Sequence, residues 1–200
     1  MKKILLLFIS MVVLGCNRQS NVVDIDCCPH CIIYIQPYES FTKEEVNKII
    51  PELKKQFDYW LYGDWTFKVN DPIKLPANSK LTNYSKYEGL KILDFQKDII
   101  EKNEVIIGLT HEDICYDIHN VKHYGIIGIS YCPGNVCVVS DKRLNNKSQM
   151  WKPILHEFMH AYYGAKHCPD DDPKCFMKDA KGHANFGIQN KLCNICDKYR

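Results

Sequence analysis

The chain has 200 residues, of which 46% are hydrophobic, and its 26 basic and 24 acidic side chains give a formal net charge of +2. This length suits one well-filled globular domain. The basic residues are scattered and the charge is nearly neutral, so the composition argues against a nucleic-acid-binding protein, which needs a basic stripe or patch.

The first sixteen residues, MKKILLLFISMVVLGC, have the pattern of an export signal. A basic start precedes an apolar run, residues 4–14, that is too short to span a bilayer. The Val-Leu-Gly-Cys ending resembles a bacterial lipobox, which implies that Cys16 is lipidated and that residues 17–26 are a tether. It also implies a location in the bacterial cell envelope, periplasmic or at the outer surface, with lipid as the sole membrane anchor. An ordinary signal peptide with a chance Cys16 is the alternative.

The domain begins with a strand and a helix. Residues 31–38, CIIYIQPY, are rich in β-branched and aromatic side chains and predict a buried strand. Thr42 and Glu45 then form a capping box, and apolar residues recur at helical spacing as far as Leu61. Pro51 is expected to kink or split this helix.

The middle of the chain predicts a second strand and a second helix. Residues 65–71 have strand composition, and residues 72–84 read as a loop. Ser85 with Glu88 predicts another capping box, which would open a helix that ends near Lys102.

The second half predicts three strands and a further helix. Residues 105–110 form the first strand, and a Pro-Gly turn joins a pair at residues 124–131 and 135–141. A helix is expected over residues 149–163, whereas the tail, residues 165–200, has little periodicity and four cysteines. This order of elements predicts a single α/β domain, residues 27–200, with a mixed sheet.

The last predicted helix carries the motif H-E-x-x-H. His156 and His160 are four residues apart and therefore lie on one face of the helix, where both can bind one zinc ion at about 2.0–2.1 Å. Glu157 lies beside them and is not a ligand. Zinc lowers the pKa of a bound water to about 7, and a carboxylate in this place can take the proton as the water attacks a peptide carbonyl.

Residues around the motif strengthen the prediction of a zinc site. The five motif residues alone could also be a pair of solvated or core histidines. The flanking side chains are apolar, Gly164 can end the helix with a positive φ, and His167 then follows as a possible third ligand.

The segment resembles the metzincin pattern H-E-x-x-H-x-x-G-x-x-H. Within the metzincins it is most similar to the archaemetzincins, in which the third histidine is followed by a cysteine, a second cysteine, a methionine and a distal C-x-x-C. The matching residues here are His167, Cys168, Cys175, Met177, Cys193 and Cys196.

The resemblance implies a zinc-dependent peptidase with a zincin-like fold. That fold has a mixed twisted sheet, backing helices, an active-site helix and a short C-terminal subdomain stapled by zinc or disulfides. The catalytic zinc would be held by His156, His160 and His167, with Glu157 as general base and acid. An extended peptide or protein substrate would pair with a strand within residues 124–131. We expect a monomer.

The resemblance also assigns roles to residues of the tail. Met177 would be the apolar floor beneath the histidines. A second, structural zinc would be held by Cys168, Cys175, Cys193 and Cys196, although two disulfides are the alternative outside the cytosol.

One departure affects the third ligand. Three residues, instead of the family's two, separate His160 from Gly164. A π-bulge or a longer helix would absorb the extra residue, or else Tyr163 would adopt a left-handed conformation. His183 and the run of Asp170–Asp172 are the fallback ligands.

The remaining cysteines are Cys27, Cys28, Cys31, Cys115, Cys132 and Cys137. The CPHC sequence, residues 28–31, copies a redox motif but precedes a strand, whereas thiol oxidants place it at the start of a helix. Disulfides are favoured, for example between Cys132 and Cys137 across the turn. A further metal site at His111, His119 and His123 is possible, although surface or loop histidines are favoured.

Two other functions stay open at this point. The helix insertion is compatible with a catalytically silent zincin-like lipoprotein that acts as a binding module. An intracellular zinc hydrolase acting on a non-peptide substrate is disfavoured by the lipobox.

Overall fold

The computed structural model describes residues 30–101, 104–118, 120–179 and 186–199. The predictions for the signal and tether, and those for Cys16, Cys27, Cys28, His119 and His183, lie outside the described residues. Within the described part of the chain, no helix is both long and apolar enough to cross a membrane.

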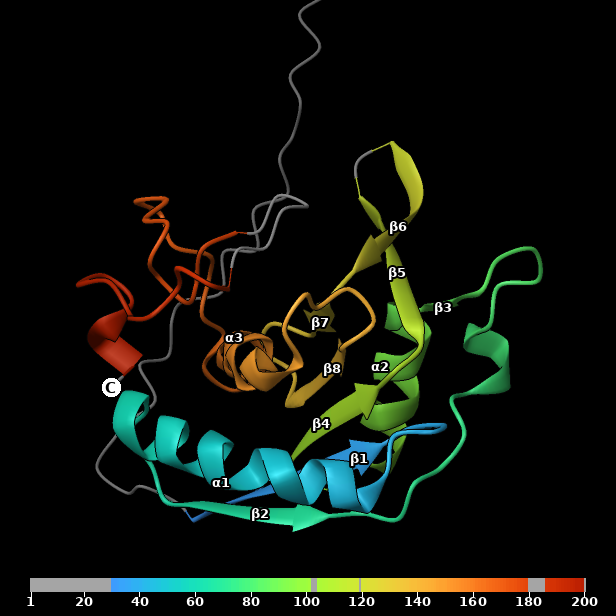
Figure 1. Cartoon of the computed structure of the whole chain (residues 1–200), viewed down its shortest axis with the longest axis horizontal. Helices are drawn as coiled ribbons and strands as arrows, with labels where there is room; N and C mark the ends of the chain where they lie inside the picture. The colour runs from blue at the N-terminus through green and yellow to red at the C-terminus, as the bar shows by residue number, and fades with distance from the viewer. Residues whose placement is uncertain (1–29, 102–103, 119, 180–185, 200) are drawn as a thin grey trace, which may run out of the picture.

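The main sheet is mixed, as predicted, and has five strands (Figure 1). In spatial order they are β2 (Trp65–Val69), β1 (Cys31–Pro37), β4 (Glu104–Thr110), β8 (Val136–Ser140) and β7 (Gly128–Ser130). The first four strands are parallel, and β7 runs antiparallel to β8 at one edge. The continuous apolar runs of β1, β4 and β8 suit parallel strands that are buried on both faces.

Helices cover both faces of this sheet (Figure 1). They are α1 (Lys43–Trp60), α2 (Gly89–Ile99) and α3 (Trp151–Tyr163). Ile33 and Ile35 point into a core shared with α1 and α3, whereas Ile106, from β4, joins a second core with α2. The fold is thus a three-layer α/β domain, which confirms the predicted fold class.

A second, three-stranded sheet was only partly foreseen. It consists of β3 (Lys86–Glu88), β5 (Asp113–Ile118) and β6 (Val121–Ile126). The predicted strand over residues 124–131 is therefore wrong as a single unit, because its first part pairs with β5 and its last part, β7, pairs with β8.

The predicted capping box at Ser85 and Glu88 is also wrong. Residues 86–88 pair in parallel with β5, and the helix begins only at Gly89, with Glu88 as an N-cap whose side chain makes no capping bond. Pairing with β5, an element that local sequence did not reveal, satisfies this backbone instead. The helix ends at Ile99, earlier than expected.

Of the two outcomes expected at Pro51, a kink or a split, the split does not occur, because α1 continues through this residue. The proline removes one backbone hydrogen bond, but it lies on the exposed side of the helix, where water can serve the freed carbonyl. Val46, Leu53 and Phe57 are buried on either side of it and hold the helix to the sheet.

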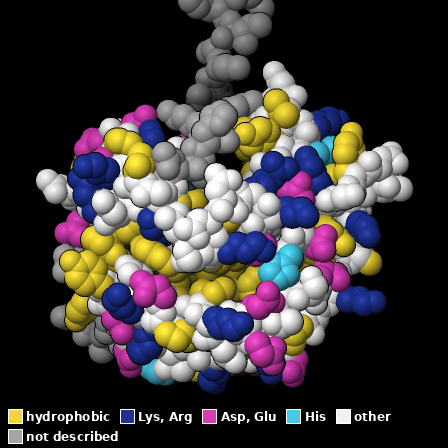
Figure 2. Space-filling view, in the orientation of Figure 1, with side chains coloured by type: hydrophobic (Ala, Val, Ile, Leu, Met, Phe, Trp, Pro, Cys, Tyr) yellow, Lys and Arg dark blue, Asp and Glu magenta, His cyan; other side chains and the backbone are white. Residues whose placement is uncertain are grey.

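Three short 3-10 helices of the described chain lie between or after the larger elements. They are η1 (Ala77–Ser79), η2 (Lys147–Gln149) and η3 (Asp197–Tyr199). Acidic and basic side chains are intermixed over the face drawn in Figure 2, in keeping with the nearly neutral composition.

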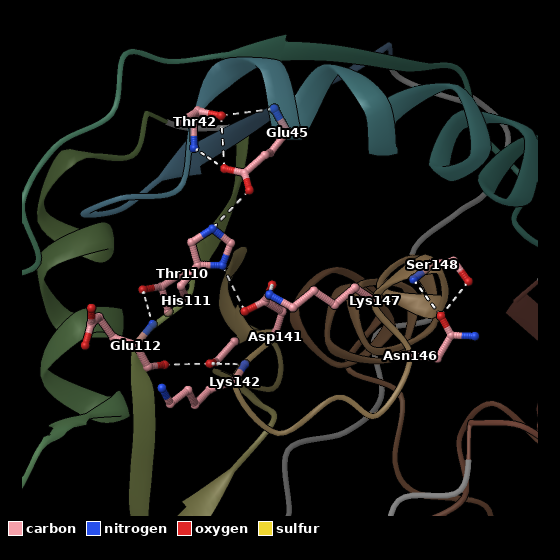
Figure 3. Close-up of polar contacts among 11 residues, drawn as sticks. Thr42, Glu45, Thr110, His111, Glu112, Asp141, Lys142, Asn146, Lys147 and Ser148 are labelled. Atoms are coloured by element: carbon pink, nitrogen blue, oxygen red, sulfur yellow. Dashed lines mark hydrogen bonds and ion pairs between the residues drawn. The ribbon is translucent and has the colours of Figure 1, made fainter.

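A polar cluster ties the start of α1 to the ends of β4 and β8 (Figure 3). His111 Nδ1 lies 2.9 Å from an Asp141 oxygen, and its Nε2 lies 3.2 Å from Glu45 Oε1. The ring stacks on Phe41, and Lys147 pairs with the second oxygen of Asp141 at 2.7 Å. Through these contacts His111 has a structural role, because it links the start of α1 to the segment that follows β8.

Of the further metal site considered for His111, His119 and His123, only His111 and His123 lie among the described residues. Among the described residues, neither histidine belongs to a group able to hold a metal ion. His123 instead lies 3.7 Å from Asp117 and against the ring of Tyr84.

The capping box of α1 is confirmed, because the Glu45 amide donates to Thr42 Oγ1 and Glu45 Oε2 accepts from the Thr42 amide. We expect Thr42→Ala to lower the free energy of unfolding by about 1 kcal/mol, since it leaves the Glu45 amide without its acceptor. Urea denaturation measures this loss. Thr82→Ala, in an exposed loop, is the matched control, and an equal loss in both variants would contradict the capping role.

Candidate functional site

Three histidines converge at the exit of α3. One ligand nitrogen from each of His156, His160 and His167 can be chosen such that all three lie within 4.8 Å of one another. His156 Nε2 and His160 Nε2 are 3.1 Å apart. Two nitrogens bound to one zinc ion with tetrahedral geometry would be about 3.3 Å apart, so this pair has a fitting separation.

The backbone fixes which nitrogen of each ring carries the hydrogen. His156 Nδ1 donates to Phe176 O at 2.7 Å, and His160 Nδ1 donates to Ala165 O at 2.5 Å. A carbonyl only accepts, so each Nδ1 carries a hydrogen and, in a neutral ring, each Nε2 carries a lone pair. Lone pairs that face each other at this distance suit a shared cation.

Burial keeps these two imidazoles neutral. It lowers the pKa of His156 to about 4 and the pKa of His160 to about 4, despite the hydrogen bonds to the carbonyls, which act in the opposite direction. Metal ligation requires the neutral ring, so the protein holds both side chains in the form that a cation needs.

The extra residue before Gly164 is absorbed by a longer helix. Residues 151–163 are α-helical throughout, so the bulge that we considered is absent, and Tyr163 is not left-handed. Gly164 has φ 62° and ψ 26°, and its amide donates to the carbonyls of His160 and Met159. The Ala165 amide also donates to Met159 O at 3.1 Å. This wide last turn brings the chain back so that His167 reaches the other two rings.

His167 is the most exposed of the three histidines and lies beside an acidic side chain. Its Nδ1 is 3.8 Å from Asp179 Oδ2. The fallback run of Asp170–Asp172 does not join the histidines in any potential metal-binding group found among the described residues. Asp172 instead pairs with Lys191 at 2.9 Å.

Glu157 lies against the edge strand β7. Its side chain is 8% exposed, and its Oε2 accepts a hydrogen bond from Ser130 Oγ at 2.9 Å. Gly128 leaves the room for it, because a Cβ on Gly128 would lie 2.6 Å from Glu157 Cγ. Burial raises the pKa of Glu157 above its ordinary value, against the opposing effect of His160.

Met177 is fully buried in the same core as α3. Its carbonyl accepts from the Cys168 amide at 2.7 Å, and the preceding carbonyl, that of Phe176, holds His156. Met177 is therefore compatible with both roles considered for it, core packing and support of the histidines.

The four tail cysteines form a second cluster. Cys168, Cys175, Cys193 and Cys196 are buried, and their sulfurs lie within 4.8 Å of one another. All four are free, and the sulfurs of Cys168 and Cys193 are 3.5 Å apart, far beyond the length of a disulfide, about 2.05 Å. Two sulfurs on a tetrahedral zinc would be about 3.8 Å apart, so the donor set suits a closed structural site.

Burial also affects the acidity of these thiols. It raises the pKa of Cys175 to about 11 and raises the pKa of Cys196 further. Metal binding at this cluster would therefore release protons at neutral pH.

The other described cysteines are not paired. Cys132 and Cys137 are both free, so the disulfide suggested across the turn is wrong. Cys137 is fully buried within β8, whereas the Cys132 thiol donates to Ala165 O at 3.4 Å. Cys31 and Cys115 are free and buried.

Sequence analysis missed three residues that contact Glu157 or the tail: Gly128, Ser130 and Lys152. Lys152, in the first turn of α3, is 8% exposed, and its ammonium group donates to the carbonyls of Phe186 and Gln189. It thereby fastens the tail to α3, next to a cavity of about 250 Å³ lined by Ile127, Leu144, Gln149 and Phe186 among others. A lone lysine inside an apolar helical run was the available signal.

Solved structures share this architecture. The chain is similar to archaemetzincin from Methanopyrus kandleri, with a TM-score of 0.69, 21% sequence identity and coverage of 84% of this chain and 92% of that one. It is also similar to archaemetzincin from Archaeoglobus fulgidus, complexed with malonate, with a TM-score of 0.63, 22% identity and coverage of 84% and 99%. No protein-family model matches the chain, and no curated protein matches it. The chain thus has the archaemetzincin fold.

The two clusters predict two zinc ions per chain. We expect His156→Ala to remove one ion and Cys193→Ser to remove the other, because each change deletes a ligand from a different donor set. Elemental analysis of dialysed protein measures the stoichiometry, with Cys115→Ser as the control for loss of a buried thiol outside both clusters. A wild-type content below two, or loss of both ions in His156→Ala, would contradict two separate sites.

Proposed function

We propose that this protein is a zinc-dependent peptidase of archaemetzincin type. The observation that carries the proposal is the convergence of three imidazoles, two with their lone pairs facing each other, beside a buried carboxylate. The shared fold supports it, since α3 occupies one face of a mixed sheet whose edge strand lies against that carboxylate.

In this proposal His156, His160 and His167 hold the catalytic zinc. When bound, zinc supplies Lewis acidity and makes water acidic enough to be deprotonated near pH 7. Glu157 takes a proton from the attacking water as its oxygen adds to the peptide carbonyl carbon. The same carboxyl group then delivers that proton to the leaving amine nitrogen as the C–N bond breaks. The raised pKa of Glu157 suits a group that must both accept and release a proton.

The substrate is proposed to be an extended peptide segment. β7 is an edge strand of the main sheet, and its residues Gly128 and Ser130 lie against Glu157. A peptide that pairs with this edge would place its backbone alongside the carboxylate. The cavity beside Ile127 and Phe186 could then receive a substrate side chain.

The second zinc is proposed to be structural. Its four sulfur donors would close a tetrahedral site with no position left for water. Cys168 directly follows His167, so the cluster would fix the third histidine through the backbone. A silent binding module remains less favoured, because the helix insertion that motivated it is accommodated by the Gly164 turn.

We expect Glu157→Gln to lower kcat for peptide hydrolysis by about 10²–10⁴-fold while zinc content stays at the wild-type level, because the amide cannot accept the proton. The assay is cleavage of a broad fluorogenic peptide library by the purified domain, with zinc measured in parallel. Glu44→Gln, in the exposed first turn of α1, is the control. A wild type that binds zinc but cleaves no peptide would support the binding module instead.

We also propose that the protein is lipidated at Cys16 and held in the bacterial cell envelope. The support is the signal-like pattern of residues 1–16 and its lipobox ending. Cys16→Ser should abolish incorporation of labelled fatty acid and move the protein from the membrane fraction to the soluble fraction, because one lipid-bearing thiol is lost. Cys115→Ser is the control, and unchanged fractionation of the Cys16 variant would rule out the anchor.

A further inference from the structure

We propose that Ser130 is a positioning residue for the reaction, which acts by hydrogen bonding to Glu157. The inference rests on the proposed function, because it concerns the residue that we assign as the base. It goes further by giving β7 a role in setting the orientation of the carboxylate.

Two residues of β7 face Glu157. Side chains alternate along a strand, so Gly128 and Ser130 share one face and Ile129 has the other. Ile129 packs into the core beside α2, whereas Ser130 Oγ lies 2.9 Å from Glu157 Oε2. Gly128 lies against the Cγ and Oε1 of the same glutamate.

These contacts limit the conformations of Glu157. The last torsion of a glutamate is broad and by itself chooses no orientation. An ionised carboxylate only accepts, so the Ser130 hydroxyl donates, and a hydrogen bond to a charged oxygen is among the stronger ones. The absent side chain of Gly128 lets the carboxylate lie close to the strand, since a Cβ there would be 2.8 Å from Oε1.

The kinetic consequence differs from that of a substrate-binding residue. Ser130 engages Oε2 through its side chain, so its loss would let the carboxylate rotate without removing a ligand of the metal. The orientation of the base matters while the proton moves, and it matters little for peptide affinity. Loss of the hydroxyl should therefore lower kcat and leave KM nearly unchanged.

Three variants test this proposal. Ser130→Ala removes the hydroxyl, and Ser130→Thr keeps it on a residue that strands favour. Ser140→Ala is the matched control, because Ser140 also lies in the main sheet, at the end of β8, and its hydroxyl donates to Glu112 O instead of to Glu157. For each variant we would measure peptide cleavage, zinc content and the affinity for acetohydroxamate. Acetohydroxamate is a metal-binding acid that offers a hydroxyl to a neighbouring base.

We expect Ser130→Ala to lower kcat about tenfold with KM within about twofold of the wild type. Its affinity for acetohydroxamate should fall about three- to tenfold, and its zinc content should stay unchanged. Ser130→Thr should recover most of both losses, and Ser140→Ala should match the wild type. Unchanged kcat and acetohydroxamate affinity in Ser130→Ala would overturn the proposal, as would equal losses in Ser140→Ala.

The acetohydroxamate measurement separates this proposal from the proposed function. A wild type that cleaves no peptide, together with a Ser130→Ala variant that binds acetohydroxamate more weakly, would refute the peptidase and retain the positioning role. A zinc-loaded wild type that binds no acetohydroxamate would overturn the positioning role as well, because Glu157 would then face no ligand.

Discussion

Two imidazole nitrogens, both with lone pairs, are held 3.1 Å apart in the interior of this domain. Such a pair repels unless a cation or a proton lies between its members, and burial disfavours the proton by lowering the pKa of both rings to about 4. Two backbone carbonyls, those of Phe176 and Ala165, hold the rings in this orientation. Each accepts a hydrogen bond from the Nδ1 atom of one ring, which leaves the lone pair on Nε2. Neither carbonyl belongs to α3, so the site exists only when the chain beyond the helix returns to it.

That return depends on contacts in a segment with little regular structure. Gly164 turns the chain with a left-handed conformation, and the Cys168 amide bonds to Met177 O, which places Phe176 O beside His156. The ammonium group of Lys152 fastens the same segment at a further point, and the four buried cysteines lie together within it. A tail with few apolar residues gains its order from such polar and sulfur contacts, because hydrophobic burial alone would not offset the entropy of fixing it.

The sequence predicted the elements that have strong local signals. The apolar runs at residues 31–38 and 105–110 correspond to β1 and β4, the Thr42–Glu45 box starts α1, and the motif helix ends at Tyr163. The H-E-x-x-H spacing identified His156 and His160, and the resemblance to archaemetzincins identified the four tail cysteines; each group lies together in the structure. The prediction failed where a partner distant in sequence decides the structure. Residues 86–88 resemble a helix start, yet they pair with β5, and no local pattern announces that partner. The neutral state of the histidines is likewise set by burial, and their tautomer by the Phe176 and Ala165 carbonyls, neither of which spacing reveals.

The edge strand β7 shows why the site could be only partly derived from local sequence. Gly128 and Ser130 are weak strand formers, so the strand takes its conformation from pairing with β8 and not from its own propensity. A larger residue at position 128 would strengthen the strand but would occupy the space of Glu157, since even a Cβ there would lie 2.6 Å from that side chain. Gly128 therefore has a low strand propensity but leaves room for the buried carboxylate of Glu157. The Gly-x-Ser sequence of β7 therefore reflects the contact of this edge strand with Glu157 of the H-E-x-x-H helix, α3.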